Sequence, residues 1–465
     1  MSSQPAWEPR AWRDATTLLF GLDGFRVVQV EVHDEAGAGA LREVVVEGLE
    51  DEQACPECGV LSASVHGRKV RVVKDLPHGP RPLRLCWDQR RWACRERACR
   101  RRTFAETSVQ IRPGQRLTGR LRAQLEVAVS GSTRSAADVA REYAVSWWSV
   151  NTALVVVAAS MLPQARAGVR LLGVDETRAR SVRWLLSQHG WRRSDPWMTS
   201  FVDLDPAHPG GLLGLAPGRS GASVRGWLDL QTPAFRAGVE VVAVDPSAPF
   251  AAALRCVLPH ATLVVDHWHL HRLANLMLTQ VRQRVTQQVH GHRGRSNNDS
   301  WAYRRLLLRG ARHLSDKQWR RLRALFATDD PTGEIQAAWA GKELLRQLLD
   351  ALPASGGPLV VDTRRDPDPA SRRIAAELRP YEVRARLGRF YDLAATAGIP
   401  ELERLAGTVE TWWPAIEAYL RLRVTNARTE GYNRKIKQIK RVSCGFRNQQ
   451  SYERRIMLNN AATAA

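Results

Sequence analysis

Three carboxylate residues of this sequence are candidates for one divalent-metal site. Asp175 follows the short apolar run Arg170–Val174, and Asp245 follows the Val-rich run Val239–Val244. Glu430 stands at the start of a basic helical stretch near the C-terminus. Mg²⁺ and Mn²⁺ prefer carboxylate oxygens, and a pair of such ions can activate a nucleophilic oxygen and stabilise the leaving oxygen of a phosphodiester. The three residues therefore predict metal-dependent phosphoryl transfer.

The stretch Val239–Arg272 contains the elements that would position such a site. Two short β-branched runs, ending at Asp245 and Asp266, flank a segment with helical spacing that follows Pro249. This pattern predicts strand, helix, strand, which is the parallel-sheet unit that carries ligand groups at its carboxyl edge. Taken alone, an aspartate there fits equally well as a residue that caps a helix or turns the chain.

Four of the seven cysteines form two closely spaced pairs, Cys55 with Cys58 and Cys94 with Cys99. Two such pairs can place four thiolates tetrahedrally around Zn²⁺, which then stabilises a module too small for its own core. His66 is an alternative ligand, but we prefer the four thiols. An odd cysteine count without an export signal favours reduced thiols or metal ligands over disulfides, and hence a cytoplasmic setting.

Composition indicates a folded protein with a polyanionic partner. The chain has 465 residues, of which 44% are apolar, and its formal charge is +22. Lys and Arg release counterions from a phosphate backbone, so double-stranded DNA is the simplest partner. Genomic composition bias is an alternative source of the arginine excess, but it does not explain the net charge. The longest apolar run, Ala153–Leu162, is too short for the roughly 20 residues of a membrane span.

Two basic segments are candidates for phosphate contact. One follows the second cysteine pair, and the other is the helix predicted at Glu430–Arg441 beside the carboxylates. Their basic residues are Arg100, Arg101 and Arg102 in the first, and Arg434, Lys435, Lys437, Lys440 and Arg441 in the second. A solvated basic face is the alternative for the first segment.

The region around residues 135–154 predicts two helices joined by a tight turn. Ser135 can cap the first helix, and the second begins near Trp147. This layout is typical of a helix-turn-helix, whose second helix enters the major groove. Trp148, Ser149 and Asn151 would then face DNA. An ordinary helical hairpin fits nearly as well in isolation.

The middle of the chain predicts a ribonuclease-H-like core. We expect strands at Val169–Val174, Val182–Leu186, Met198–Asp203, Val239–Val244 and Ala261–Val265, with a helix at Ala222–Leu230. In this order Asp175 ends the first strand and Asp245 ends the fourth, so both emerge near the middle of the sheet. From His267 to about Arg423 the sequence is charged and helical, which predicts an all-helical insertion before Glu430. Helical spacing is found at Trp301–Phe326, Glu334–Leu352 and Ile399–Leu422, and turn clusters are predicted at Asp329–Gly333, Pro353–Pro358 and Arg364–Pro369.

Several motifs together resemble one family. They are Cys-Pro-Glu-Cys-Gly at 55–59, Gly-Val-Asp-Glu at 173–176, Asp-His-Trp-His at 266–269 and Thr-Asn-x-x-x-Glu-Gly at 425–431. The sequence is similar to the DDE transposases of the ISL-three family of bacterial insertion sequences. The resemblance implies Asp175, Asp245 and Glu430 as the catalytic triad, with Asp266 and His269 as an accessory pair. It also implies a homo-oligomer on DNA, with element ends and target DNA as substrates.

The predicted organisation is multidomain α/β. It comprises an N-terminal lead-in (1–50), a zinc-binding module (51–108), a helix-turn-helix domain (113–165), the first part of the ribonuclease-H-like core (166–272), an all-helical insertion (273–423) and the core helix with the catalytic glutamate (424–465). Within the lead-in, the residue pattern predicts strands at Phe25–Val32 and Leu41–Glu47.

Two other functions fit parts of the pattern. A non-enzymatic DNA-binding regulator derived from such a transposase would use the zinc module and helix-turn-helix, but it would leave the three carboxylates without a purpose. A related nuclease, such as a resolvase or an RNA-guided enzyme, is the second. RNA-guided enzymes usually carry their cysteine pairs late in the chain, whereas here the pairs precede the core. This order favours transposition.

Overall fold

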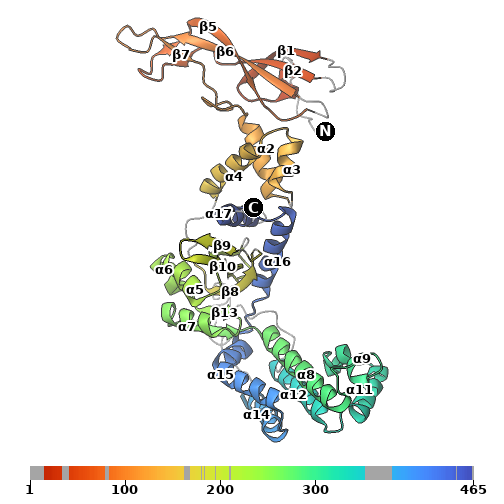
Figure 1. Cartoon of the computed structure of the whole chain (residues 1–465). Coiled ribbons are helices and arrows are strands. Elements are labelled where there is room, and N and C mark those ends of the chain that lie inside the picture. Colours follow the sequence, from red (N-terminus) through yellow and green to blue (C-terminus); the bar gives the residue numbers. More distant parts are fainter. Residues whose placement is uncertain are drawn as a thin grey trace, which may run out of the picture. The chain divides into compact units, whose positions relative to one another are not determined.

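A computed structural model of the chain forms two compact units (Figure 1). It describes residues 15–462 except 34–40, 79–82, 133, 162–167, 180, 183, 194, 209–210, 351–379 and 447. Unit 1 comprises Met1–Leu162, Val442–Cys444 and Gln450–Thr463. Unit 2 comprises Pro163–Arg441, Gly445–Gln449 and Ala464–Ala465. Among the described residues, no single helix combines the length and the apolar character needed to cross a membrane.

Unit 1 begins with helix α1 (Ala15–Phe20) and a sheet in the strand order β1-β2-β6-β5, with β7 paired to β6. The strands are β1 (Phe25–His33), β2 (Leu41–Gly48), β5 (Val65–Val73), β6 (Leu83–Ala93) and β7 (Thr103–Ala105). The strands predicted at Phe25–Val32 and Leu41–Glu47 are therefore confirmed. Because β2 pairs with β6, the predicted lead-in and the predicted zinc module share one sheet.

Four further helices of unit 1 pack around a separate apolar cluster. They are α2 (Gly119–Ser130), α3 (Ala136–Glu142), α4 (Trp147–Met161) and α17 (Gln449–Ala462). Ser135 caps α3 by accepting a hydrogen bond from the Asp138 N–H, as its sequence position predicts. Leu458 of α17 lies in the same cluster as Leu121 and Val150. The last helix therefore belongs to unit 1, whereas the predicted organisation places 424–465 with the core.

Unit 2 contains a mixed sheet in the order β12-β11-β8-β13-β14. Its strands are β8 (Leu171–Arg178), β11 (Trp197–Asp203), β12 (Leu212–Pro217), β13 (Val241–Val244) and β14 (Thr262–Val265). Within this sheet, β11 pairs antiparallel with both β8 and β12. On the other side of β8, β13 pairs with it in parallel, and β14 pairs in parallel with β13. The predicted first and fourth strands are thus adjacent at its centre.

One predicted core strand is wrong. The run Val182–Leu186 does not join the central sheet; it contributes to β9 (Trp184–Ser187), which pairs with β10 (Gly190–Arg193) in a separate hairpin. The third core strand is β12, whose pattern is interrupted by Gly214. A Cβ at Gly214 would lie 2.3 Å from Trp227 Nε1, so tertiary packing requires glycine at a position where a β-branched residue would have signalled a strand.

Helices cover both faces of this sheet. On one face, α5 (Gly221–Asp229), α6 (Pro233–Gly238) and α7 (Ala248–Val257) bury an apolar cluster that includes Leu172, Val174, Val242 and Val244 of the strands. On the other face lies α16 (Ala427–Val442), because Gly173 contacts its first turn. Successive residues of β8 therefore face opposite sides of the sheet, one side packing on the apolar cluster and the other facing α16.

The segment between β14 and α16 is helical among its described residues, as predicted (Figure 1). Its helices are α8 (His267–His290), α9 (Asp299–Ala302), α10 (Arg304–Leu307), α11 (Asp316–Thr328), α12 (Glu334–Leu349), α14 (Pro380–Thr396) and α15 (Pro400–Leu422). The helical pattern at Trp301–Phe326 is divided among three of these helices and a 3-10 turn at Ala311–His313. The predicted turn clusters Pro353–Pro358 and Arg364–Pro369 lie outside the described residues.

Candidate active site

Three aspartates lie level with one another on three adjacent strands. Val244 of β13 pairs in parallel with Val174 of β8 on one side and with Val265 of β14 on the other. The next residue of each strand path is an aspartate: Asp175, Asp245 and Asp266. Neighbouring strands are about 4.8 Å apart. The register therefore gathers three carboxylates from distant parts of the sequence along one sheet edge.

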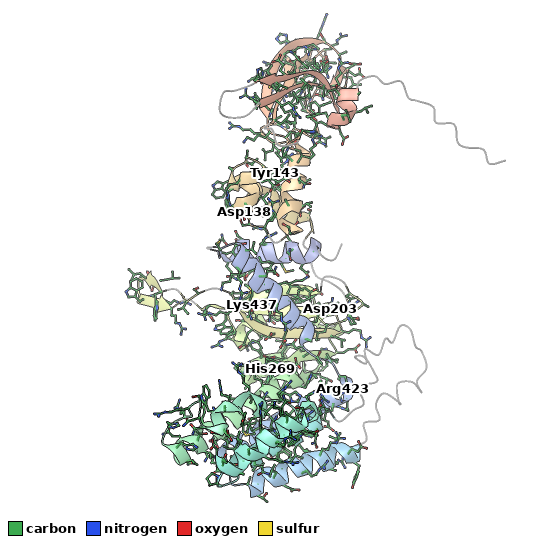
Figure 2. The ribbon with its side chains drawn as sticks, turned by 90° about the vertical axis from the view of Figure 1, so that its right-hand side faces the viewer. Asp138, Tyr143, Asp203, His269, Arg423 and Lys437 are labelled. Carbon is green, nitrogen blue, oxygen red and sulfur yellow. The ribbon has the colours of Figure 1, made fainter. Side chains whose placement is uncertain are left out.

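Two helices bring the remaining acidic and imidazole groups to this edge. His269, in the first turn of α8 (Figure 2), places Nε2 2.9 Å from Asp245 Oδ1 and 3.8 Å from Glu430 Oε1. Ligand atoms of Asp266, His269 and Glu430 all lie within 4.8 Å of one another. The contacts of His269 thus bring Asp245 and Glu430 to the same edge, where Asp175 and Asp266 flank Asp245 in the strand register.

Asp175 is held by a residue to which the sequence analysis assigned no role. Asn433 donates from Nδ2 to Asp175 Oδ2 at 2.7 Å, and its Oδ1 accepts from Ser200 Oγ at 3.0 Å. The Ser200 hydroxyl therefore fixes which end of the amide faces the carboxylate. Asn433 follows Glu430 by three residues on α16, so both share one face of the helix. That spacing was the available signal for its role.

α16 approaches the sheet closely because Gly173 has no side chain. A Cβ at Gly173 would lie 2.2 Å from Thr429 Oγ1 and 2.8 Å from Asn426 Oδ1. Asn426 also donates from Nδ2 to the Val174 carbonyl at 3.2 Å. The first turn of α16 is therefore fixed against β8, and Glu430 follows directly from it.

β8 continues past Asp175 to Arg178 because β11 pairs with it along this length. Asp175 thus ends the parallel pairing with β13 and does not end the strand itself, in contrast to the sequence prediction. This continuation leaves Asp175 buried, with 8% of its surface exposed.

The electrostatics of the site favour a bound cation. Burial and the negative charge of Asp245 raise the pKa of Asp175 to about 7. The same two causes raise the pKa of the neighbouring Glu176. Although burial opposes it, the hydrogen bond to Asp245 and its charge raise the pKa of His269. Carboxylates this close repel one another when ionised. A cluster of carboxylate oxygens with this excess of negative charge fits Mg²⁺ or Mn²⁺.

The aspartates differ in their freedom to bind a ligand. Asp266 is the N-cap of α8, where its Oδ1 accepts from the Trp268 N–H at 3.1 Å, and its side chain is 3% exposed. Asp245 has no helix to cap in this way, and its side chain is 19% exposed. Asp245 is therefore the more exposed of the two carboxylates, and it is not committed to capping a helix.

The basic residues of α16 lie away from its buried face. Asn433, Ile436 and Ile439 face the interior. The positively charged side chains are exposed or half-buried, and Lys437 is one of them (Figure 2). They are Arg434, Lys435, Lys437, Lys440 and Arg441. The helix that carries Glu430 thus also presents a positive surface suited to phosphates.

The four cysteines of unit 1 form a separate cluster with the geometry of a zinc site. Cys58 Sγ lies 3.6 Å from Cys94 Sγ, and Cys55 Sγ lies 3.9 Å from Cys99 Sγ. A tetrahedron with Zn–S bonds of about 2.3 Å has S···S edges of about 3.8 Å. His66 is not part of this cluster. The thiol spacing therefore fits Zn²⁺ without rearrangement.

The strands around the cysteines place each pair on its own turn. The short hairpin of β3 (Gln53–Ala54) and β4 (Leu61–Ser62) surrounds the first pair, and Gly59 adopts a φ of 75° in its turn. The backbone N–H of Cys58 lowers the pKa of Cys55 to about 7, whereas burial raises the pKa of Cys94 to about 12. A bound cation would allow all four thiols to ionise together.

The candidate DNA-contacting residues of unit 1 differ in their exposure. Arg100, Arg101 and Arg102 are exposed beside the cysteine cluster. Helices α3 and α4 are bent by 118° at their connection, an angle typical of a helix-turn-helix. Trp148 is 71% exposed on α4. Ser149 and Asn151 are half-buried, and Ser149 Oγ lies 3.0 Å from Ser146 Oγ within the helix start.

The chain is similar to known transposases along most of its length. A family model described as a transposase matches residues 172–358 and 371–456. A model described as the zinc-finger of transposase IS204/IS1001/IS1096/IS1165 matches residues 51–99, which include the four clustered cysteines. The transposase for insertion sequence element IS1001 of Bordetella parapertussis is 24% identical over 437 residues, which cover 93% of this chain and 95% of the relative.

Proposed function

Because the chain belongs to the ISL-three family of DDE transposases, we propose that it cuts DNA at the terminal inverted repeats of its insertion sequence and joins the ends to target DNA. Asp175, Asp245 and Glu430 are the catalytic triad in this proposal. The observation that carries it is the strand register that aligns Asp175 with Asp245, together with the contact from His269 to both Asp245 and Glu430.

The arrangement suits two successive in-line transfers at phosphorus. One or two Mg²⁺ or Mn²⁺ ions bound by the triad would activate the attacking oxygen and neutralise charge on the leaving oxygen. Water attacks first, and the freed 3′-hydroxyl then attacks target DNA. Because oxygen nucleophiles from water and DNA serve both steps, no tyrosine or serine of the chain needs to form a covalent intermediate.

The chain's own residues position the reactants. Asn433 keeps Asp175 oriented through its hydrogen bond to Oδ2. Gly173 lets α16 approach β8, so that Glu430 reaches the same edge as the two aspartates. The basic face of α16 would hold phosphates next to the carboxylates, since Lys and Arg neutralise the phosphate backbone.

The remaining parts have supporting roles in this proposal. The strand order β12-β11-β8-β13-β14 supports a ribonuclease-H-like core, interrupted by the helical insertion between β14 and α16. The bent α3–α4 pair supports a helix-turn-helix that reads the inverted repeats through Trp148, Ser149 and Asn151. The four cysteines hold a structural Zn²⁺, and Arg100, Arg101 and Arg102 contact DNA phosphates beside it. Pairing of two element ends requires a homo-oligomer on DNA.

The first test compares the wild-type protein with Glu430→Gln on a labelled duplex that carries the end of the element encoding the chain. With Mg²⁺ or Mn²⁺, wild type should yield cleaved and joined products, and the variant should bind the duplex but yield neither. Glu417→Gln, the same substitution at an exposed position of α15, is the matched control and should react like wild type. Equal binding with no cleavage by any of the three proteins would support a DNA-binding regulator instead.

A second comparison separates the two candidate aspartates. Asp245→Asn should abolish strand transfer. Asp266→Asn should retain measurable transfer, because asparagine caps helices about as well as aspartate and preserves the start of α8. Full strand transfer by Asp245→Asn would remove Asp245 from the triad.

A further inference from the structure

The hairpin formed by β9 and β10 stands apart from the sheet of unit 2. Its two strands pair with each other, and every residue in both strands is exposed. Isolated two-stranded hairpins are only marginally stable in water. An exposed hairpin inserted between two core strands therefore gains little from the fold of unit 2, which indicates a role in contacting a partner.

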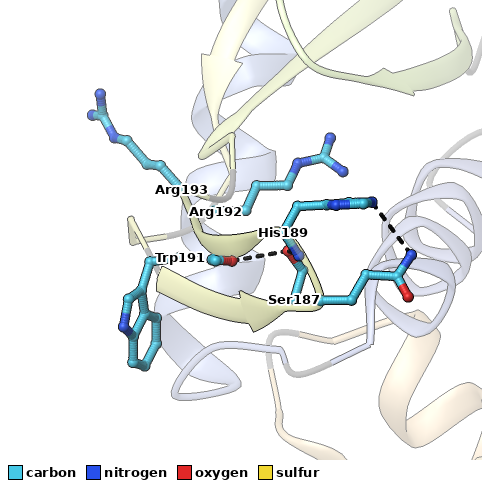
Figure 3. A pocket seen from close by; sticks show the side chains of 7 residues that line it. Ser187, His189, Trp191, Arg192 and Arg193 are labelled. Carbon is cyan, nitrogen blue, oxygen red and sulfur yellow. Dashed lines mark hydrogen bonds between the residues drawn. The ribbon is translucent and has the colours of Figure 1, made fainter.

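The hairpin presents large apolar side chains to solvent. Leu186 of β9 pairs directly with Trp191 of β10, so the two side chains share one face, and Trp184 lies two residues before Leu186 on the same face. These three side chains are 71%, 67% and 61% exposed, respectively. Figure 3 shows Trp191 projecting to the opposite side of the hairpin from Arg192. Such an indole face can stack on planar groups.

The charge around the indoles is positive. No acidic residue occurs between Glu176 and Asp195 in the sequence, whereas Arg192 and Arg193 follow Trp191 directly. Trp191, Arg192, Arg193 and His189 line a pocket at the hairpin tip (Figure 3). A second copy of this chain would bring another formal charge of +22 toward the hairpin. Charge complementarity therefore favours a polyanion over a second copy.

The hairpin is also connected to the strand that carries Asp175. β8 runs only three residues beyond Asp175 to Arg178, a distance of about 10 Å, before the chain enters the hairpin region. Arg178 lies close enough to α16 for its charge, after burial, to help lower the pKa of Lys440. The end of β8, from which the chain continues to the hairpin, thus lies near Lys440 of the helix that also carries Glu430.

We propose that this hairpin binds the DNA end at the cleavage site, with Trp184 and Trp191 stacking on bases that are unpaired there while Arg193, which pairs with Trp184 on the same face, contacts the backbone. This inference rests on the proposed function, because it places the cut DNA end at the Asp175 edge. It adds a partner contact outside the carboxylates. Stacking on the indoles would hold the strand end while the nucleophile is exchanged.

Binding to forked DNA tests the stacking contact without any catalytic step. The full-length protein should bind a duplex with a few unpaired terminal bases more tightly than the same duplex fully paired, in the absence of divalent metal. Loss of one stacked base weakens binding about fivefold or more. Trp191→Ala should therefore lose about fivefold or more of its affinity for the fork, with little change for the paired duplex, and Trp191→Phe should retain most of it.

Site-specific crosslinking identifies the partner. The photoreactive residue p-benzoylphenylalanine at Leu186 should crosslink to the unpaired strand of the fork. The same residue at Leu230, which is 84% exposed at the end of α5, should not. Crosslinking of position 186 to a second protein chain, or equal fork binding by wild type and Trp191→Ala, would overturn the proposal. Because neither assay measures cleavage, their results stand apart from the Glu430→Gln test.

Discussion

The substitution Gly173→Ala tests whether the close approach of α16 to β8 creates the active site. The added Cβ would lie 2.2 Å from Thr429 Oγ1, and 2.8 Å from both Asn426 Oδ1 and Leu204 Cδ2. Restoring the first contact to an ordinary 3.4 Å requires a movement of 3.4 − 2.2 = 1.2 Å. Thr429 is fully buried on α16 directly before Glu430, so this movement displaces the proposed catalytic glutamate.

Two magnitudes follow from this displacement. Overpacking of a buried position lowers the free energy of unfolding by about 1–3 kcal/mol. A misplacement of about 1 Å at a catalytic group can reduce the rate about 100-fold. The loss of stability alone would leave the fraction of folded protein nearly unchanged. The rate of strand transfer by Gly173→Ala should nevertheless fall by about 100-fold.

The assays are the rate of strand transfer on the element-end duplex and the thermal unfolding temperature. Gly226→Ala is the matched control, because Gly226 lies exposed within α5 and a Cβ there meets nothing within 4 Å. It should be as active as wild type and slightly more stable. A Gly173→Ala protein with a rate within twofold of wild type would refute the reasoning. Adding Thr429→Ala removes the nearest contact and should restore part of the rate.

Two further predictions concern the zinc site and acid stability. Cys58→Ser should lose the bound zinc that wild type retains, whereas Cys256→Ser, at an exposed cysteine outside the cluster, should keep it, as measured by metal analysis of the purified proteins. Hydrogen bonds from Arg284 lower the pKa of Glu401, so this ion pair stabilises the fold above the ordinary glutamate pKa of about 4.3. That stabilisation is lost as the pH falls through the lower folded pKa. The difference in Tm between wild type and Glu401→Gln should therefore stay constant near neutral pH and shrink below about pH 4; a difference unchanged down to pH 3 would contradict it.

The zinc site and the family were accessible from local sequence patterns. The spacing within each pair, Cys55 with Cys58 and Cys94 with Cys99, is a local feature of the sequence. It predicts a zinc site because each pair needs only one turn of the chain to present its two thiols. Apolar runs ending in aspartate likewise marked β8, β13 and β14 with small errors at their ends. These signals depend on backbone periodicity and on residue chemistry, both of which can be read along the chain.

The errors arose where long-range packing overrides the local pattern. The run at Val182–Leu186 has strand character, yet it belongs to an exposed hairpin outside the central sheet. Conversely, β12 is part of the central sheet although it contains Gly214, where the packing of Trp227 leaves no room for a side chain. The sequence also placed the chain end with the core, but Leu458 packs with the helices of unit 1. Hydrophobic burial selects such partners by shape, which a pattern within one segment does not contain.

By itself the sequence determined the residue types of the two proposed metal sites, the strands beside two of the proposed catalytic carboxylates, and the family. Only the tertiary structure decided that Val244 pairs with both Val174 and Val265, which aligns the three aspartates. It also decided that Asn433 orients Asp175. The physical reason is that register and helix approach depend on contacts between residues up to 258 positions apart. Such contacts form only when the whole unit packs.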